Sequence, residues 1–210
     1  MARSAAPSPA TLLSACASGN DALARMCLQA GVPADTRDAG GDTALAAAAL
    51  NGHLSMCKLL LEAGASADAA SQEGGDTVLM WAAAAGDPDI LELLLQHGSN
   101  VNATNDQGYT ALYRATYKDH AVAVRLLLAA GADVHARTTL GGQGKTALDC
   151  ARENRHEECA YWLSAFARED LVEMEKVKIM WPEAASNYIR LPSPDLVGRS
   201  PSPSPPRHHK

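Results

Sequence analysis

The stretch GDTVLMWAAAAGDPDILELLLQHGSNVN, residues 75–102, decides how this chain folds. A threonine near its start is followed by an alanine-rich run up to Gly86, and then by three leucines at 93–95 and a second glycine at 98. Threonine suits the position just before a helix, and a glycine between two apolar runs permits a left-handed turn. The stretch therefore predicts two short helices joined by a tight turn.

The same pattern recurs along the chain at a regular interval. Its threonines lie 34, 33 and 36 residues apart, at Thr43, Thr77, Thr110 and Thr146. A weaker unit precedes them, in which Gly19 and Gly31 keep the twelve-residue spacing of Gly86 and Gly98. Periods of 20 to 50 residues are typical of solenoids, in which each unit packs on the next.

These units resemble the ankyrin repeat, whose motif of about 33 residues begins T-P-L-H-x-A and continues through a glycine turn and a leucine-rich second helix. The resemblance covers residues 10–167 and implies an all-α ankyrin-repeat solenoid of about five helix-turn-helix repeats with β-turn finger loops. The chain departs from the motif, because Asp119 and Arg155 replace the glycine between the helices. We expect the turns at both positions to be strained or to have a different shape.

The leucines of the second helices are the expected core. They form one inward stripe, at Leu60, Leu61, Leu94, Leu95, Leu127 and Leu128. Each fully buried leucine stabilises the fold by roughly 1.5–3 kcal/mol. The repeats are expected at 10–38, 39–71, 72–104, 105–140 and 141–167, of which the first and last are caps.

The two ends of the chain lie outside the repeats. Residues 1–9 are expected to be flexible, residues 168–182 to form a capping helix, and the Pro/Ser-rich residues 183–210 to be disordered. Four serines of the tail precede proline and are candidate phosphorylation sites, namely Ser193, Ser200, Ser202 and Ser204. The tail also suits a polyproline segment for SH3 or WW domains, or a plain solubilising function.

The segment GGQGKTALDC, residues 141–150, looks like a phosphate-binding loop. Such a loop needs G-x-x-x-x-G-K-[ST] after a buried strand, and the first glycine falls on Thr139. No hydrophobic strand precedes it. The segment aligns with the start of the other repeats, so we interpret it as an elongated finger.

Composition restricts the partners and the compartment. A net charge of −6 disfavours nucleic acid and anionic membranes as partners. The sequence contains no run of about 18 apolar residues, so we expect no membrane span. The five cysteines are scattered without a C-x-x-C pair, which favours reduced thiols in the cytoplasm or nucleus. An organellar presequence at the N-terminus is the alternative, although the first repeat explains most of that segment.

No catalytic or metal site stands out. His53, His120 and His156 recur once per repeat, too far apart to share one ion, and we interpret them as solvated helix starts. We expect no cofactor, no metal and no small-molecule substrate. Asn102 matches the position at which asparagines of ankyrin repeats are hydroxylated, which makes it a candidate for that modification.

Proteins of the ankyrin family usually bind partners on the concave face. The resemblance places there Asp42, Leu50, Asn51, Asp76, Met80, Trp81, Ala85, Tyr109, Tyr113, Arg114, Tyr117 and Lys118. Tryptophan, tyrosine and arginine are enriched in interface hot spots. The alternative for Trp81 and Tyr113 is packing between neighbouring repeats, whereas Tyr117 and Lys118 are expected to be exposed.

The sequence therefore predicts a monomeric, non-enzymatic module that binds another protein as an adaptor or scaffold. One alternative is a small inhibitor of an enzyme such as a kinase, like the short ankyrin inhibitors of cyclin-dependent kinases. Another is an enzyme or enzyme subunit with catalytic groups in the long finger at residues 137–145, which includes Lys145, or in the tail. Fold alone does not name the partner.

Overall fold

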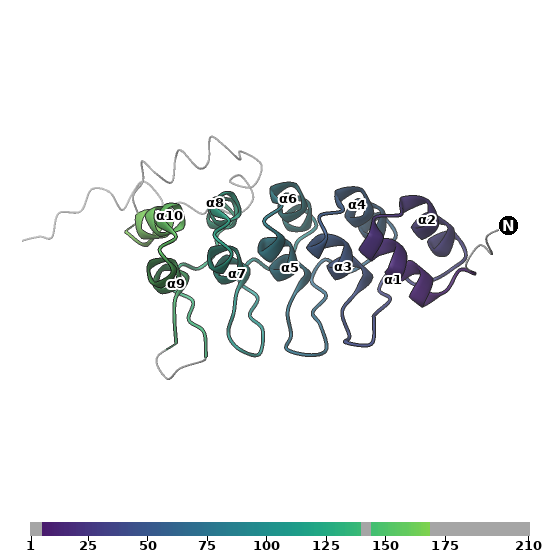
Figure 1. Ribbon diagram of the computed structural model, residues 1–210, viewed down its shortest axis with the longest axis horizontal. Coiled ribbons are helices and arrows are strands. Elements are labelled where there is room, and N and C mark those ends of the chain that lie inside the picture. Colours follow the sequence, from purple (N-terminus) through teal and green to yellow (C-terminus); the bar gives the residue numbers. More distant parts are fainter. Residues whose placement is uncertain (1–5, 140–143, 169–210) are drawn as a thin grey trace, which may run out of the picture.

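The computed structural model of the protein describes residues 6–139 and 144–168, and these residues form α-helices joined by loops (Figure 1). The helices are α1 (Pro9–Ser18), α2 (Asp21–Gln29), α3 (Ala44–Leu50), α4 (Leu54–Glu62), α5 (Val78–Ala85), α6 (Pro88–Gln96), α7 (Ala111–Tyr117), α8 (Ala121–Ala129), α9 (Ala147–Asn154) and α10 (Glu157–Ala167). The predicted all-α solenoid is confirmed. The predicted helix at 168–182, the tail and its four serines lie outside the described residues, apart from Arg168, which ends α10.

The helices stack in two rows that run the length of the molecule (Figure 1). The odd-numbered helices form one row, in which α5 packs between α3 and α7, and the even-numbered helices form the other. Long loops project from the odd-numbered row as fingers, and isolated antiparallel bridges, Arg37 with Thr43 and Ala70 with Thr77, close the bases of two of them. Each repeat therefore contacts chiefly its neighbours in the stack.

Each of the four recurring threonines begins a helix, as the sequence predicts. The side-chain oxygens of Thr43, Thr77, Thr110 and Thr146 each accept a hydrogen bond from the backbone N–H three residues later, at 3.1–3.3 Å. At Thr146 the carboxylate of Asp149 also accepts from the threonine backbone N–H at 3.0 Å, which completes a capping box. The threonines thus set where α3, α5, α7 and α9 start.

The turn between the paired helices requires a left-handed backbone. Gly52 and Gly86 adopt φ angles of 73° and 77° there, and Asp119 and Arg155 adopt 61° and 60° at the equivalent positions. A side chain in this conformation crowds the following carbonyl, at a cost of roughly 1–2 kcal/mol. Both residues keep the left-handed turn of the glycines, which agrees with the first of the two predicted outcomes, a strained turn, rather than a different shape.

The core lies between the two rows of helices. Leu60, Leu94 and Leu127 are fully buried, and the leucines that follow them are nearly so. Small residues such as Ala48 and Ala82 are also fully buried and let consecutive odd-numbered helices approach closely. The leucine stripe predicted from the sequence is therefore part of the hydrophobic core.

Three histidines connect consecutive repeats, which the sequence did not reveal. Each ring bonds a backbone carbonyl of the preceding repeat, namely His53 to Ala17, His120 to Ala84 and His156 to Thr116, at 2.8–3.2 Å. The three residues do begin α4, α8 and α10 and are partly accessible, as predicted, but the bonds to the preceding repeat were not foreseen. Their recurrence once per repeat was the available signal.

Truncation of Leu94 tests the core. We expect Leu94→Ala to lower the free energy of unfolding by about 2–5 kcal/mol, because the change leaves a cavity at a fully buried site. Urea unfolding followed by circular dichroism measures the loss. Leu50→Ala is the matched control, since Leu50 is 46% exposed, and its effect should stay within about 0.5 kcal/mol.

Replacement of Arg155 by glycine tests the strain. We expect Arg155→Gly to stabilise the fold by about 0.5–1 kcal/mol, because glycine adopts this φ freely while its extra freedom in the unfolded chain offsets part of the gain. Arg152→Gly, in the last turn of α9, should instead destabilise by up to about 1 kcal/mol, because glycine is a poor helix former. Equal losses in both variants would contradict the strain.

Candidate inner-face binding site

The candidate site is the inner face, defined as the finger loops together with the adjoining surface of the odd-numbered helices. Most of the side chains predicted from the sequence are at least partly accessible, namely Asp42, Leu50, Asn51, Asp76, Trp81, Ala85, Tyr109, Tyr113, Arg114, Tyr117 and Lys118. Tyr117, at 55% exposure, and Lys118 are exposed as expected. Trp81 packs partly against the core, so it combines the two predicted alternatives.

The prediction for Met80 was wrong. Its side chain is 1% exposed and belongs to the hydrophobic core. With 3.6 residues per turn, adjacent positions on α5 point in clearly different directions, so Met80 turns inward where Trp81 reaches the inner face. Met80 therefore belongs to the core beneath the inner face.

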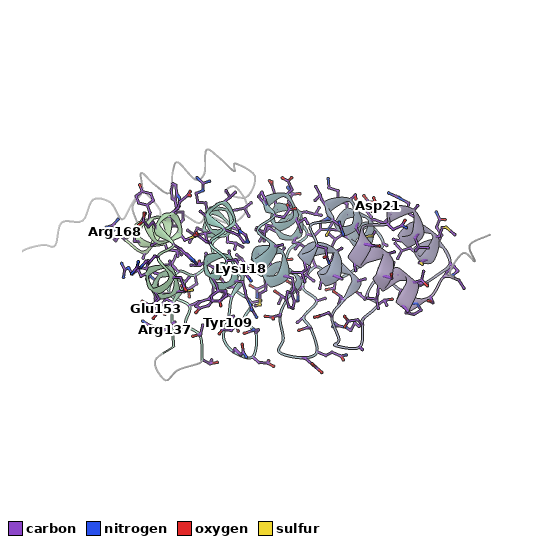
Figure 2. All side chains as sticks on the ribbon, in the orientation of Figure 1. Asp21, Tyr109, Lys118, Arg137, Glu153 and Arg168 are labelled. Carbon is purple, nitrogen blue, oxygen red and sulfur yellow. The ribbon has the colours of Figure 1, made fainter. Side chains whose placement is uncertain are left out.

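Tyrosines form a cluster at the fourth repeat. The rings of Tyr109 and Tyr113 lie 4.9 Å apart at 34°, and Tyr117 follows one helical turn later. Together with Gln107 and Arg114 they line a cavity of about 310 Å³. Figure 2 shows Tyr109 near the bases of the fingers, below the helices.

An ion pair fixes the arginine of this cluster. The Nη2 atom of Arg114 donates to both carboxylate oxygens of Asp76 at 2.8 Å, and its guanidinium lies 4.9 Å from the centre of the Tyr109 ring. Asn105 Nδ2 also donates to Asp76 at 2.8 Å. The side chain of Arg114 is 30% exposed and that of Asp76 is 14% exposed, so this ion pair is partly buried. It links the third repeat to the fourth.

A second, smaller cavity lies between the second and third repeats. Its volume is about 140 Å³, and its lining includes Asp38, Asp42, Leu50 and Trp81. Burial raises the pKa of the Asp42 carboxyl, and the negative charges of Asp38 and nearby acids raise it further. A positive group in this cavity would therefore be favoured.

The thiols and the long finger offer little catalytic chemistry. All five cysteines are buried and none forms a disulfide. Burial raises the pKa of Cys16, Cys57 and Cys159 to about 12, which keeps these thiols protonated. Lys145 is paired with Glu153, which raises the pKa of the lysine and opposes a role as a base. Among residues 6–139 and 144–168, no group of three His, Cys, Asp or Glu side chains is arranged to hold a metal.

The long finger predicted at residues 137–145 is described only at its base. There Thr138 N donates to the Lys145 carbonyl at 3.0 Å, and Lys145 N donates back to Thr138 Oγ1 at 2.9 Å. Residues 140–143 lie outside the described part of the chain. The closed base agrees with the interpretation of this segment as a finger.

Asn102 joins the third repeat to the fourth. Its Oδ1 accepts from Asp133 N at 2.8 Å, and its Nδ2 donates to the Gly131 carbonyl at 3.2 Å. Asp35 and Asp68 make the first of these bonds at the two preceding junctions, to Ser66 N and Asn100 N. Asn102 therefore has a structural function, and its hydroxylation stays a prediction.

Two family models match this chain. One, described as ankyrin repeats (3 copies), matches residues 79–171, and the other, described as ankyrin repeats (many copies), matches residues 12–61 and 45–95. The chain belongs to the ankyrin-repeat family. A search of curated proteins returned no match. Ankyrin repeats are generally protein–protein interaction modules. Within the described ranges, no helix is long and apolar enough to cross a membrane.

A double-mutant cycle tests the link between the third and fourth ankyrin repeats. We expect Asp76→Ala and Arg114→Ala to show a coupling of about 1 kcal/mol in the free energy of unfolding, because the pair is partly buried and well aligned. Lys145 and Glu153 provide the control cycle. Both of their side chains are 53% exposed, so their coupling should be clearly smaller. Equal couplings would show that the Asp76 pair adds nothing beyond an ordinary surface contact.

Proposed function

We propose that the protein binds a partner protein on its inner face and serves as an adaptor or scaffold. One observation supports this most strongly, namely the cavity of about 310 Å³ that Tyr109, Tyr113, Tyr117 and Arg114 line on that face. Tyrosine and arginine are the residue types that dominate binding energy in protein interfaces, where they fill or form pockets at the centre. A partner side chain of matching shape would enter this cavity.

The mechanism is recognition by a preorganised surface. Asp76 and Tyr109 hold the guanidinium of Arg114, and Tyr113 stacks on Tyr109, so these side chains have little freedom to lose on binding. The packed helices beneath them keep the cavity in place. The affinity would then depend on the fit of the partner rather than on ordering of the site.

The same proposal includes a cytoplasmic or nuclear location. All five cysteines are buried as free thiols, and thiols persist in compartments that glutathione and thioredoxin keep reducing.

Affinity capture tests the proposed face. The full chain is immobilised and exposed to a native lysate, alongside a Trp81→Ala, Tyr113→Ala, Tyr117→Ala variant. We expect the variant to capture at least about tenfold less of the specific partners, because loss of one hot-spot side chain alone costs about 2 kcal/mol or more. Quantitative mass spectrometry of the bound fraction measures the difference.

The control variant removes three exposed side chains from even-numbered helices, Met26→Ala, Val122→Ala and Tyr161→Ala, and should capture as the wild type does. A milder variant, Leu50→Asp with Tyr117→Asp, changes two exposed residues of the inner face and guards against unfolding of the triple variant. Circular dichroism confirms that each variant is folded. Unchanged capture by folded inner-face variants would refute the proposal.

A further inference from the structure

The inner face contains the same acidic position at two successive junctions, but only one of them is paired. Asp42 and Asp76 each directly precede the threonine that caps an odd-numbered helix. Arg114, four residues after the capping threonine of the fourth repeat, reaches back to Asp76. Trp81 occupies the equivalent position in the third repeat. The junction between the second and third repeats, at Asp42, therefore has the carboxylate but lacks the arginine.

Two polar atoms at this junction have no hydrogen-bond partner among the described residues. Asp42 Oδ1 and Trp81 Nε1 are both buried, and neither bonds to another described residue. Buried polar atoms of native proteins are nearly always paired, so each unpaired one calls for an explanation. Here one atom is an acceptor and the other a donor, and both residues line the cavity of about 140 Å³.

The charges around this cavity select a cation. Asp38 lines it beside Asp42, and Glu73 and Asp76 also act on the Asp42 carboxyl through their negative charges. Arg37 is the positive group nearby, and its Nη1 is already bonded to the carbonyls of Gly41 and Ala70 at 2.6 and 2.7 Å. An acidic ligand would be repelled, whereas a cation would find an unpaired carboxylate oxygen.

We infer that this cavity receives an arginine side chain from an extended segment of the partner protein. The inference rests on the proposed binding function of the inner face and names the chemistry of one contact. The guanidinium lies between the Asp42 carboxylate and the Trp81 ring, as that of Arg114 lies between Asp76 and Tyr109. A backbone carbonyl of the same segment accepts the N–H of Trp81.

Arginine fits this cavity better than lysine. Its planar guanidinium donates to a carboxylate through two parallel hydrogen bonds and stacks on an aromatic ring at the same time, whereas an ammonium is a compact, strongly hydrated charge. Leu50 supplies an apolar wall for the methylene groups of the side chain. The junction between the third and fourth repeats already shows such a contact. There the carboxylate of Asp76 and the ring of Tyr109 hold the guanidinium of Arg114.

Nuclear magnetic resonance of the ¹⁵N-labelled full chain tests the inference. The probe is N-acetyl-arginine N-methylamide, and the matched compounds contain lysine or citrulline, the uncharged isostere of arginine, in its place. The readout is the indole N–H signal of Trp81, assigned with Trp81→Phe. We expect the arginine probe to shift this signal in a saturable manner, the lysine probe to bind at least about threefold more weakly, and the citrulline probe to leave it in place.

Two variants complete the design. Asp42→Asn preserves the shape of the cavity and removes its charge, so it should weaken arginine binding at least about tenfold. Asp106→Asn removes the same charge from an exposed residue of another finger and should bind as the wild type does. Equal responses to arginine and citrulline, an unaltered Asp42→Asn variant or no response of Trp81 would each overturn the arginine site.

Failure of the proposed function gives a different result. If capture from the lysate depends on the inner face but Trp81 ignores the arginine probe, the face binds a partner and the arginine site is refuted. If Trp81 responds to arginine but capture does not depend on the inner face, the cavity binds arginine as inferred and the proposed partner-binding function is refuted.

Discussion

The structure depends on one constraint: a single pair of short helices cannot shield its own apolar side. The leucines of the even-numbered helices need the helices of the neighbouring repeats to exclude water from them. Alanines on the odd-numbered helices allow that approach, since larger side chains would hold consecutive helices of the row apart. Stability and architecture therefore have the same cause, and the stack extends as far as the pattern of leucine and alanine continues.

Features governed by local rules could be predicted from the sequence. Each threonine caps its own helix, and the turn geometry forces Asp119 into a left-handed conformation whatever its neighbours are. Contacts between repeats were harder to predict. Met80 was placed on the surface by alignment with the family, although the packing of α5 turns it inward, and the carbonyl partners of the histidines lie 36 to 40 residues away in the chain.

The candidate site was predicted in its residues but not in its pairings. Alignment placed Asp76 and Arg114 on one face, and only the structure shows that they bind each other across a junction. The difference between this junction and the preceding one, where Trp81 stands in for the arginine, comes from a single position in the repeat. The same scaffold can thus hold a closed contact at one junction and an open cavity at the next.

The most direct test of the central claim compares one repeat with the whole. A synthetic peptide of residues 72–104, the third repeat, and the full chain are examined by circular dichroism during urea unfolding. The account predicts that the full chain is helical and unfolds cooperatively, whereas the peptide shows no cooperative transition, because its leucines have no neighbour to pack on. A helical peptide that unfolds cooperatively as a monomer would contradict it.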